Sequence, residues 1–191
     1  MSKAVPALFL AFVAVILSYA FAHRSGEPKP ATGVQIETTM IMSAAPVGTA
    51  RVAVGGRGRI FRQDDAKSPW VAVKSPTEAT LTRVHFLDGQ NGLIVGHDQV
   101  ILRTADGGKT WKQVFIDAAA ETPLFDVVQL DATRALAIGA YGLFLETVDG
   151  GTTWSSRFIL PEGEDRHLNA IAKLADGTLM IAGEAGTILR S

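Results

Sequence analysis

The chain has 191 residues, with 18 Lys or Arg against 19 Asp or Glu, and it contains no cysteine. This near balance of charge disfavours polyanion binding driven by an overall positive field, so no nucleic-acid partner is expected. The lack of cysteine excludes disulfides, thiol catalysis, Cys-ligated zinc and lipid attachment to an N-terminal cysteine. All 19 glycines lie beyond residue 25, and a glycine-rich chain with short apolar runs is typical of an all-β protein with tight turns.

The first 22 residues have the pattern of an export signal. Lys3 precedes a charge-free run over 4–22, which ends in Ala20-Phe21-Ala22, a sequence similar to a signal cleavage site. An uncleaved membrane anchor is the alternative, because about 18 apolar residues can just span a bilayer. The pattern predicts a signal helix over 1–22 and export to a periplasm or lumen. Membrane contact is expected only through residues 4–22, if they are not cleaved.

The next residues, 23–45, have the composition of a linker. Pro28, Pro30 and, directly after this stretch, Pro46 stand among small and polar residues, a composition that disfavours a packed element. An extended segment over 34–41 is compatible with it. The folded domain is therefore expected to occupy residues 46–191.

An internal repeat organises this domain. Trp70, Trp111 and Trp154 are spaced 41 and 43 residues apart, and a glycine lies 15 residues before each. A fourth glycine follows at the next interval, and similar apolar runs flank all four. These repeat glycines are Gly55, Gly96, Gly139 and Gly183. Self-similarity at this period predicts stacked supersecondary units that share a continuous core.

Each repeat is predicted to contain four short strands. Apolar runs at 81–87, 123–130 and 167–174 are each followed by an Asp-containing turn and then by a short strand that ends at the repeat glycine. A third strand, such as 100–104, and a fourth strand that begins at the tryptophan complete the unit. This is the spacing of a β-propeller blade, whose faces are buried only by neighbouring blades. We therefore predict an all-β, incomplete propeller of four-stranded antiparallel blades, with about three and a half repeats.

The turn between the third and fourth strands has a recurring sequence. Residues 104–111 (TADGGKTW) and 147–154 (TVDGGTTW) fit the pattern S/T-x-D-x-G-x-T-W, known as the Asp box. Asp can accept hydrogen bonds from the backbone of its own turn, glycine permits positive φ, and Trp supplies an apolar plug. The first copy, 63–70, lacks both glycines, as expected of a terminal repeat. The predicted structural residues are Asp65, Trp70, Thr104, Asp106, Gly108, Thr110, Trp111, Thr147, Asp149, Gly151, Thr153 and Trp154.

Together with L-x-x-V-x-F-x-D at 81–88 and G-x-x-V-G at 92–96, these motifs resemble the photosystem II stability/assembly factor-like group of Asp-box propellers, in the sialidase-like superfamily. The resemblance covers about residues 50–191. It implies a non-enzymatic exported scaffold that binds a protein partner, with membrane proteins as the partner class, and assists assembly of a membrane complex. Family propellers close with more blades, so the chain is expected to be a fragment or a truncated product.

The arginines are the candidates for partner binding. Three of them occupy the same repeat position, seven residues after the glycine, where the third repeat has Glu146. The resemblance implies an arginine patch that holds a partner polypeptide, which here would consist of Arg57, Arg59, Arg62, Arg103 and Arg190. The alternative is that each side chain bonds backbone carbonyls of the adjacent blade. Repeated positions usually serve the repeat, which favours this structural interpretation.

No metal, cofactor or catalytic residue is predicted. Each Asp box supplies one carboxylate, whereas calcium sites need several oxygen ligands, and the four histidines show no ligand spacing. A fragment of a sialidase-like glycoside hydrolase is the alternative function, and the resemblance implies that it would need an arginine cluster and a Tyr–Glu pair. Tyr141 lies in a repeat turn. The stretch 58–61, which contains Arg59, is similar to the sialidase arginine motif but lacks the proline of that motif. A truncated chain without independent function is the remaining possibility.

Overall fold

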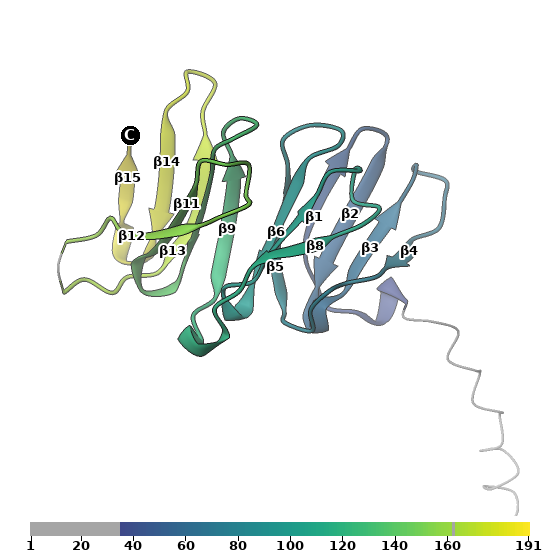
Figure 1. Cartoon of the computed structure of the whole chain (residues 1–191), viewed down its shortest axis with the longest axis horizontal. Coiled ribbons are helices and arrows are strands. Elements are labelled where there is room, and N and C mark those ends of the chain that lie inside the picture. The colour runs from purple at the N-terminus through teal and green to yellow at the C-terminus, as the bar shows by residue number, and fades with distance from the viewer. Residues whose placement is uncertain (1–34, 162) are drawn as a thin grey trace, which may run out of the picture. The chain divides into compact units, whose positions relative to one another are not determined.

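The computed structural model describes residues 35–161 and 163–191. The predicted signal over 1–22 lies outside the described residues. In the described part, the strands form three four-stranded sheets and one three-stranded sheet, all with antiparallel pairing (Figure 1). None of the helices in these ranges is long and apolar enough to cross a membrane.

Each sheet is one blade, and the blades are numbered here in chain order. Blade 1 consists of β1 (Ile41–Val47), β2 (Ala50–Gly55), β3 (Ile60–Gln63) and β4 (Val71–Val73). Blade 2 consists of β5 (Leu81–Phe86), β6 (Gly92–Gly96), β7 (Ile101–Thr104) and β8 (Lys112–Phe115). Blade 3 consists of β9 (Leu124–Gln129), β10 (Ala135–Gly139), β11 (Leu143–Thr147) and β12 (Ser155–Phe158). Blade 4 consists of β13 (Leu168–Lys173), β14 (Leu179–Gly183) and β15 (Ile188–Arg190).

Short 3-10 helices join these strands. In every blade one of them connects the second strand to the third: η2 (Gly56–Gly58), η3 (His97–Gln99), η5 (Ala140–Gly142) and η6 (Glu184–Gly186). Two more precede blade 1 and blade 3, η1 (Ile36–Thr38) and η4 (Ala118–Ala120). The second residue of each connecting helix has a left-handed backbone conformation.

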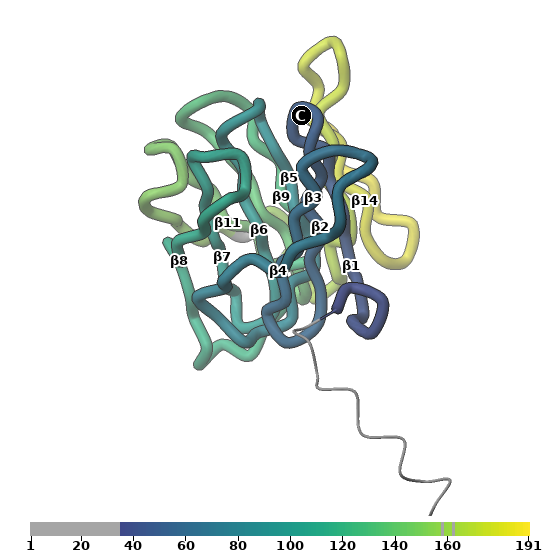
Figure 2. Tube along the Cα trace, turned by 90° about the vertical axis from the view of Figure 1, so that its right-hand side faces the viewer, coloured from purple at the N-terminus to yellow at the C-terminus, as the bar shows by residue number. Residues whose placement is uncertain are grey.

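The first strands of successive blades are neighbours: β1 contacts β5, β5 contacts β9, and β9 contacts β13. The fourth strand of each complete blade is the far edge of its sheet, and in Figure 2 β8 lies on the opposite side from β1. The prediction of antiparallel blades in an all-β fold is thereby confirmed. The fourth strands begin one residue after the tryptophans at which their starts were predicted.

Blade 1 begins earlier than the sequence predicted. β1 starts at Ile41, inside the range 23–45 that was predicted to be a linker, and it pairs with β2 from Ile41–Gly55 to Val47–Ala50. Pro46 contributed to the linker prediction because proline interrupts most strands. β1 is an edge strand in its sheet, and an edge strand tolerates a proline because one side of it needs no ladder partner.

Three apolar clusters fill the spaces between blades. The first joins Val52, Val54 and Ile60 of blade 1 to Leu81 and Ile94 of blade 2. The other two have the same composition pattern: one combines Leu93, Val95 and Ile101 with Leu124 and Ala137, and the next combines Leu136, Ile138 and Phe144 with Leu168 and Ile181. Each middle blade is therefore buried on both faces, as the repeat pattern requires.

The repeat glycines are needed because another backbone segment passes close to them. A Cβ atom on Gly96 would overlap the carbonyl oxygen of Thr80, which precedes β5, and that oxygen accepts a hydrogen bond of 2.9 Å from the N–H of His97. The other three repeat glycines face equivalent carbonyls, those of Met40, Pro123 and His167. Any side chain at these positions would force apart the first and second strands of the blade.

We expect Gly96→Ala to lower the free energy of unfolding by about 1–3 kcal/mol, because the added methyl group must displace the Thr80 backbone. Gly89→Ala is the matched control, since a Cβ atom on Gly89 would meet no atom within 4 Å. This control should stay within about 1 kcal/mol of wild type. Urea unfolding followed by circular dichroism would measure both, and equal stability of the two variants would contradict the close-approach explanation.

Candidate functional site

The two complete Asp boxes have one hydrogen-bonding pattern. In blade 2, Asp106 Oδ1 accepts bonds from the backbone N–H groups of Lys109 and Thr110, both at 2.9 Å, and Oδ2 accepts the Thr110 hydroxyl at 2.6 Å. The Thr104 hydroxyl donates to Asp106 Oδ1 at 2.8 Å and accepts the Gly108 N–H at 3.0 Å. Asp149 repeats these contacts in blade 3. In this geometry both carboxylate oxygens serve the turn.

The first copy closes its turn differently. Asp65 Oδ1 accepts the N–H groups of Lys67 and Ser68 at 2.8 and 3.0 Å, and Oδ2 accepts the Ser68 hydroxyl at 2.6 Å. Ser68 therefore supplies the hydroxyl that Thr110 supplies in blade 2, from a position one residue closer to the aspartate. Because this turn is tighter, it needs neither of the two glycines that are present in the complete Asp boxes and absent from residues 63–70.

The Asp box of one blade packs against the preceding blade. Gly108 has a φ of +82°, and a Cβ atom there would lie 2.7 Å from a Val52 methyl group of blade 1. Trp111 is buried in the cluster between blades 1 and 2, and its ring meets Phe86 edge to face at a centroid distance of 6.0 Å. The box thus contributes to the contact between blades as well as to its own hairpin.

Hydrogen bonding lowers the pKa of both complete Asp-box carboxyls. For Asp106, burial is the largest single influence and acts to raise the pKa, but the donors on Thr110 and Thr104 and the neighbouring backbone together outweigh it and bring the pKa from 3.8 to about 2. For Asp149 the side chain and backbone of Thr153 are the main donors, and the pKa is again about 2.

Two of the repeat-position arginines reach the Asp box of the next blade. Arg62 Nε donates to the carbonyl oxygen of Gly107 at 3.1 Å, and its guanidinium also pairs with Asp64. Arg103 extends in the same way beside Gly150 and Gly151 of blade 3. The Arg62 bond has the form that the structural interpretation expects, and Arg103 occupies the equivalent place. In the third blade Glu146 instead pairs with Arg157 on the adjacent strand, at 2.8 Å, and Arg190 is exposed on β15.

Arg57 and Arg59 lie at the other end of β3. η2 carries Arg57 and β3 follows Arg59, whereas Arg62 is near the Asp-box end of that strand. The five predicted arginines are therefore divided between two ends of the blades and do not form one patch. Partner binding by these residues stays a prediction.

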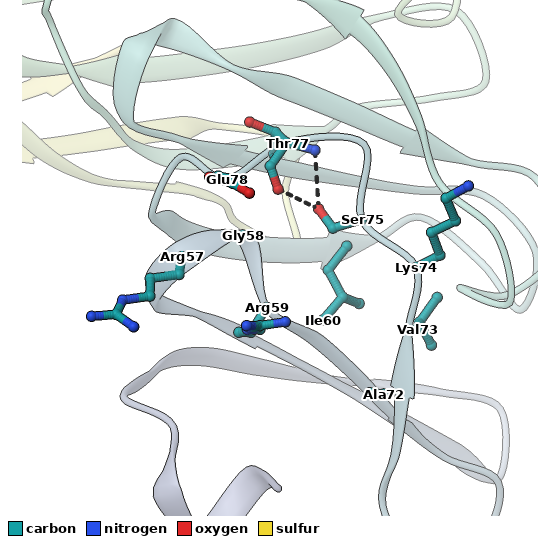
Figure 3. A pocket seen from close by; sticks show the side chains of 10 residues that line it. All are labelled: Arg57, Gly58, Arg59, Ile60, Ala72, Val73, Lys74, Ser75, Thr77 and Glu78. Carbon is teal, nitrogen blue, oxygen red and sulfur yellow. Dashed lines mark hydrogen bonds between the residues drawn. The ribbon is translucent and has the colours of Figure 1, made fainter. Parts of the chain in front are cut away.

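Arg57 and Arg59 line a pocket of about 810 Å³, called here the turn pocket, between η2 and the segment that joins blades 1 and 2 (Figure 3). Lys74 lies on the opposite side of the pocket from Arg57, and Arg59 lies between them. Gly58 allows the joining segment to approach, because a Cβ atom there would overlap the Thr77 carbonyl oxygen. Ser75 and Thr77 hold this segment in place through a bond of 3.1 Å from the Ser75 hydroxyl to the Thr77 carbonyl oxygen.

The turn pocket is basic. It combines three cationic side chains with one carboxylate, that of Glu78, and its lining includes the half-buried Val73. Such a surface suits a polypeptide segment that carries acidic and apolar side chains. Lys74 lies between repeats, where periodicity gives no signal, so it could not be predicted from the sequence.

Tyr141, the residue of interest for a sialidase-like reaction, lies in η5 with a φ of +55°. It is 60% exposed, its ring meets that of His167 at a centroid distance of 4.8 Å, and its N–H donates to His167 Nδ1 at 3.0 Å. These contacts pair Tyr141 with a histidine, whereas a sialidase-like reaction would need a Tyr–Glu pair. In the described ranges no three His, Asp or Glu side chains come together as metal ligands.

The chain matches a family whose description is "Photosynthesis system II assembly factor YCF48" over residues 62–191. A stretch of 56 residues is 45% identical to the photosystem II assembly lipoprotein Ycf48 of Prochlorococcus marinus (strain NATL2A), and it covers 29% of this chain and 17% of that protein. The match thus spans less than a fifth of the relative. The resemblance that the sequence motifs indicated is confirmed.

Solved structures with the same fold include an assembly protein and an enzyme. "YCF48 bound to D1 peptide" has a TM-score of 0.64 and 20% identity, over 83% of this chain and 52% of that one. The GH74 xyloglucanase of Xanthomonas campestris has a TM-score of 0.63 and 17% identity, over 78% of this chain and 29% of that one. At these identities the likeness shows the fold alone, so the enzyme neighbour adds no support for glycoside hydrolysis.

We expect Asp106→Ala to lower the free energy of unfolding by about 1–3 kcal/mol, because the turn loses its acceptor for two backbone N–H groups and two hydroxyls. Asp117→Ala, at an exposed position just before η4, is the matched control and should change stability little. Thermal unfolding would measure both variants. An Asp106→Ala protein as stable as the control would rule out a structural role for this carboxylate.

Acid should destabilise the protein through the same carboxylates. Because the pKa of Asp106 and of Asp149 is lowered from 3.8 to about 2 in the folded state, their contribution is complete above about pH 4 and is lost as the pH falls towards 2. The double variant Asp106→Asn/Asp149→Asn should be less stable at neutral pH and should show a flatter loss of stability over this window. Melting temperatures measured from pH 6 to pH 2 would test this, and parallel curves would contradict it.

Proposed function

Since the chain belongs to the photosystem II assembly factor Ycf48 family, we propose that it is a non-enzymatic scaffold that binds a segment of a membrane-protein partner and assists assembly of a membrane complex. The proposed binding site is the turn pocket. The observation that carries this assignment is the placement of Arg57, Arg59 and Lys74 around a pocket of about 810 Å³ that has a single carboxylate, Glu78, in its wall.

The chemistry of the pocket supports an acidic polypeptide as ligand. The cationic side chains at its rim come from two stretches of backbone: Arg57 and Arg59 from η2 and the residue after it, and Lys74 from the segment after β4. An extended segment could contact all three cations while one of its apolar side chains reaches the half-buried Val73. Charge complementarity of this kind mainly favours encounter and register, and the apolar contact adds buried area.

A related structure supports the choice of probe. The YCF48 structure that shares this fold is bound to a D1 peptide. D1 is therefore the first membrane protein to test as a source of the bound segment. The Prochlorococcus marinus relative is named a lipoprotein, which supports a position outside the cytoplasm. This chain has no cysteine, so the export signal proposed at 1–22 is the feature that would take it there.

The test measures binding of overlapping, fluorescently labelled D1 peptides to the full chain by anisotropy. We expect acidic D1 peptides to bind and the double variant Arg57→Glu/Arg59→Glu to weaken binding by about tenfold or more, because it reverses two charges at the rim. Lys109→Glu/Lys112→Glu is the matched control, since both lysines are exposed beside the Asp box of blade 2 and outside the turn pocket.

Arg62→Glu separates binding from folding. This side chain bonds Gly107 of the next blade, so the variant should lower the melting temperature while the folded fraction keeps its affinity for the peptide. Equal loss of affinity in the turn-pocket variant and in the lysine control would show that the peptide responds only to the net charge of the chain, and would contradict binding at the turn pocket. If no D1 peptide binds the wild type, or if the folded Arg57→Glu/Arg59→Glu protein binds as tightly as wild type, the proposal is wrong.

A further inference from the structure

A second polar cavity lies along the first strands of blades 2, 3 and 4. It has a volume of about 410 Å³ and is called here the inner-strand groove. Arg83 and His85 of β5, Gln129 of β9 and Lys173 of β13 line it. The groove is near the strand ends where Phe86 pairs with Gly92, which is the end away from the turns that form the turn pocket.

The buried carboxylate of Asp126 connects the strands that line the groove. Asp126 is 4% exposed. Its Oδ1 accepts the N–H of Val127 at 2.8 Å and pairs with Arg83 Nε at 3.0 Å. Its Oδ2 accepts the N–H of Ile171 at 3.0 Å. Asp126 thereby links blades 2, 3 and 4. The Arg83 side chain is 50% exposed and uses Nε for this ion pair, so its guanidinium is held at a fixed place with its other end available to a ligand.

A second cation is fixed at the opposite wall. Lys173 Nζ donates to the carbonyl oxygen of Leu130 at 3.0 Å, and an ammonium group has two further N–H donors. Arg83 and Lys173 together carry two positive charges against the one negative charge of Asp126. The walls of the groove contain no other carboxylate, so the site has an excess of one positive charge.

Two polar side chains lie between these cations. His85 Nδ1 and Gln129 Oε1 are buried, and neither reaches full hydrogen-bond geometry with a group of the described chain. A side-chain hydrogen bond with Gln129 nevertheless acts on the pKa of His85, so these two groups lie beside each other in the groove. Burial, the largest influence, lowers the pKa of His85 below 6.5 despite the opposing effect of Asp126. The imidazole is therefore neutral at neutral pH, with one nitrogen able to donate and the other able to accept.

We propose that the inner-strand groove is a binding site for a carboxylate group. The Arg83 guanidinium and the Lys173 ammonium bind its oxygens, and His85 and the Gln129 amide complete the hydrogen bonding. A monoanion matches the single excess charge, whereas a phosphate dianion would leave a negative charge uncompensated beside Asp126. The carboxylate can belong to a free organic acid or to an acidic side chain of a polypeptide, and these two sources share the chemistry of the site.

The test follows the imidazole signals of the full chain, labelled with 15N-histidine, at constant ionic strength. The His85→Gln variant assigns the signal of His85. Acetate and the capped residue acetyl-Glu-amide are the two carboxylate probes, acetyl-Gln-amide is the neutral control and inorganic phosphate is the competing anion. We expect a saturable shift of the His85 signal with a carboxylate probe and none with acetyl-Gln-amide. Saturation by acetate alone would identify a free acid as the ligand, and stronger saturation by acetyl-Glu-amide would identify a side chain.

Two variants make the result specific to the groove. Lys173→Gln removes an exposed charge and should weaken carboxylate binding by about fivefold or more, while Lys112→Gln, an exposed lysine outside the groove, should bind as wild type does. Melting curves verify that both variants are folded. The absence of a saturable shift, unchanged binding by Lys173→Gln, or tighter binding of phosphate than of either carboxylate would each overturn the proposal.

Discussion

The structure depends on the burial of each blade face by the next blade. A single four-stranded sheet with apolar side chains on both faces has no core of its own, and three clusters between blades provide it. Directed hydrogen bonds add order to this packing: the Thr82 hydroxyl donates to the Leu124 carbonyl oxygen at 2.7 Å, and the Arg62 guanidinium donates to Gly107. Apolar contact supplies most of the free energy, and the polar contacts fix which strand lies beside which.

The repeat glycine makes this stacking possible at one end of each blade. The backbone just before the first strand passes close to the repeat glycine, and the connecting 3-10 helix follows this glycine directly. The third strand therefore begins at the same place relative to the first strand in each blade. The turn pocket is a consequence of this geometry, because Arg57 and Arg59 belong to the turn that follows Gly55. Backbone packing of this turn thus sets the position of the charged pocket.

Periodicity predicted the parts of the molecule that repeat and missed those that do not. The predicted run 81–87 differs from β5 by a single residue, because alternation, turn residues and the repeat glycine all agree there. β1 was hidden by Pro46, whose tolerance depends on an edge position that only the sheet defines. Ser68 was missed as the hydroxyl donor of the first Asp box, since it is displaced by one residue from its counterpart. His85 and Lys173 have no repeat equivalents of the same type, and only the structure brings them together.

The blades combine a fixed backbone with free side-chain choice at one position. The second residue of the connecting turn is left-handed in all four blades, with φ values of 56°, 58°, 55° and 51° at Arg57, Asp98, Tyr141 and Ala185. A non-glycine residue in this conformation costs about 1–2 kcal/mol, and the surrounding contacts maintain it in every blade. Packing does not select the side chain, which is a cation, an anion, an aromatic ring and a methyl group in turn. A position that the fold holds rigidly and leaves chemically free is where a repeat scaffold can acquire specificity for a partner without loss of stability.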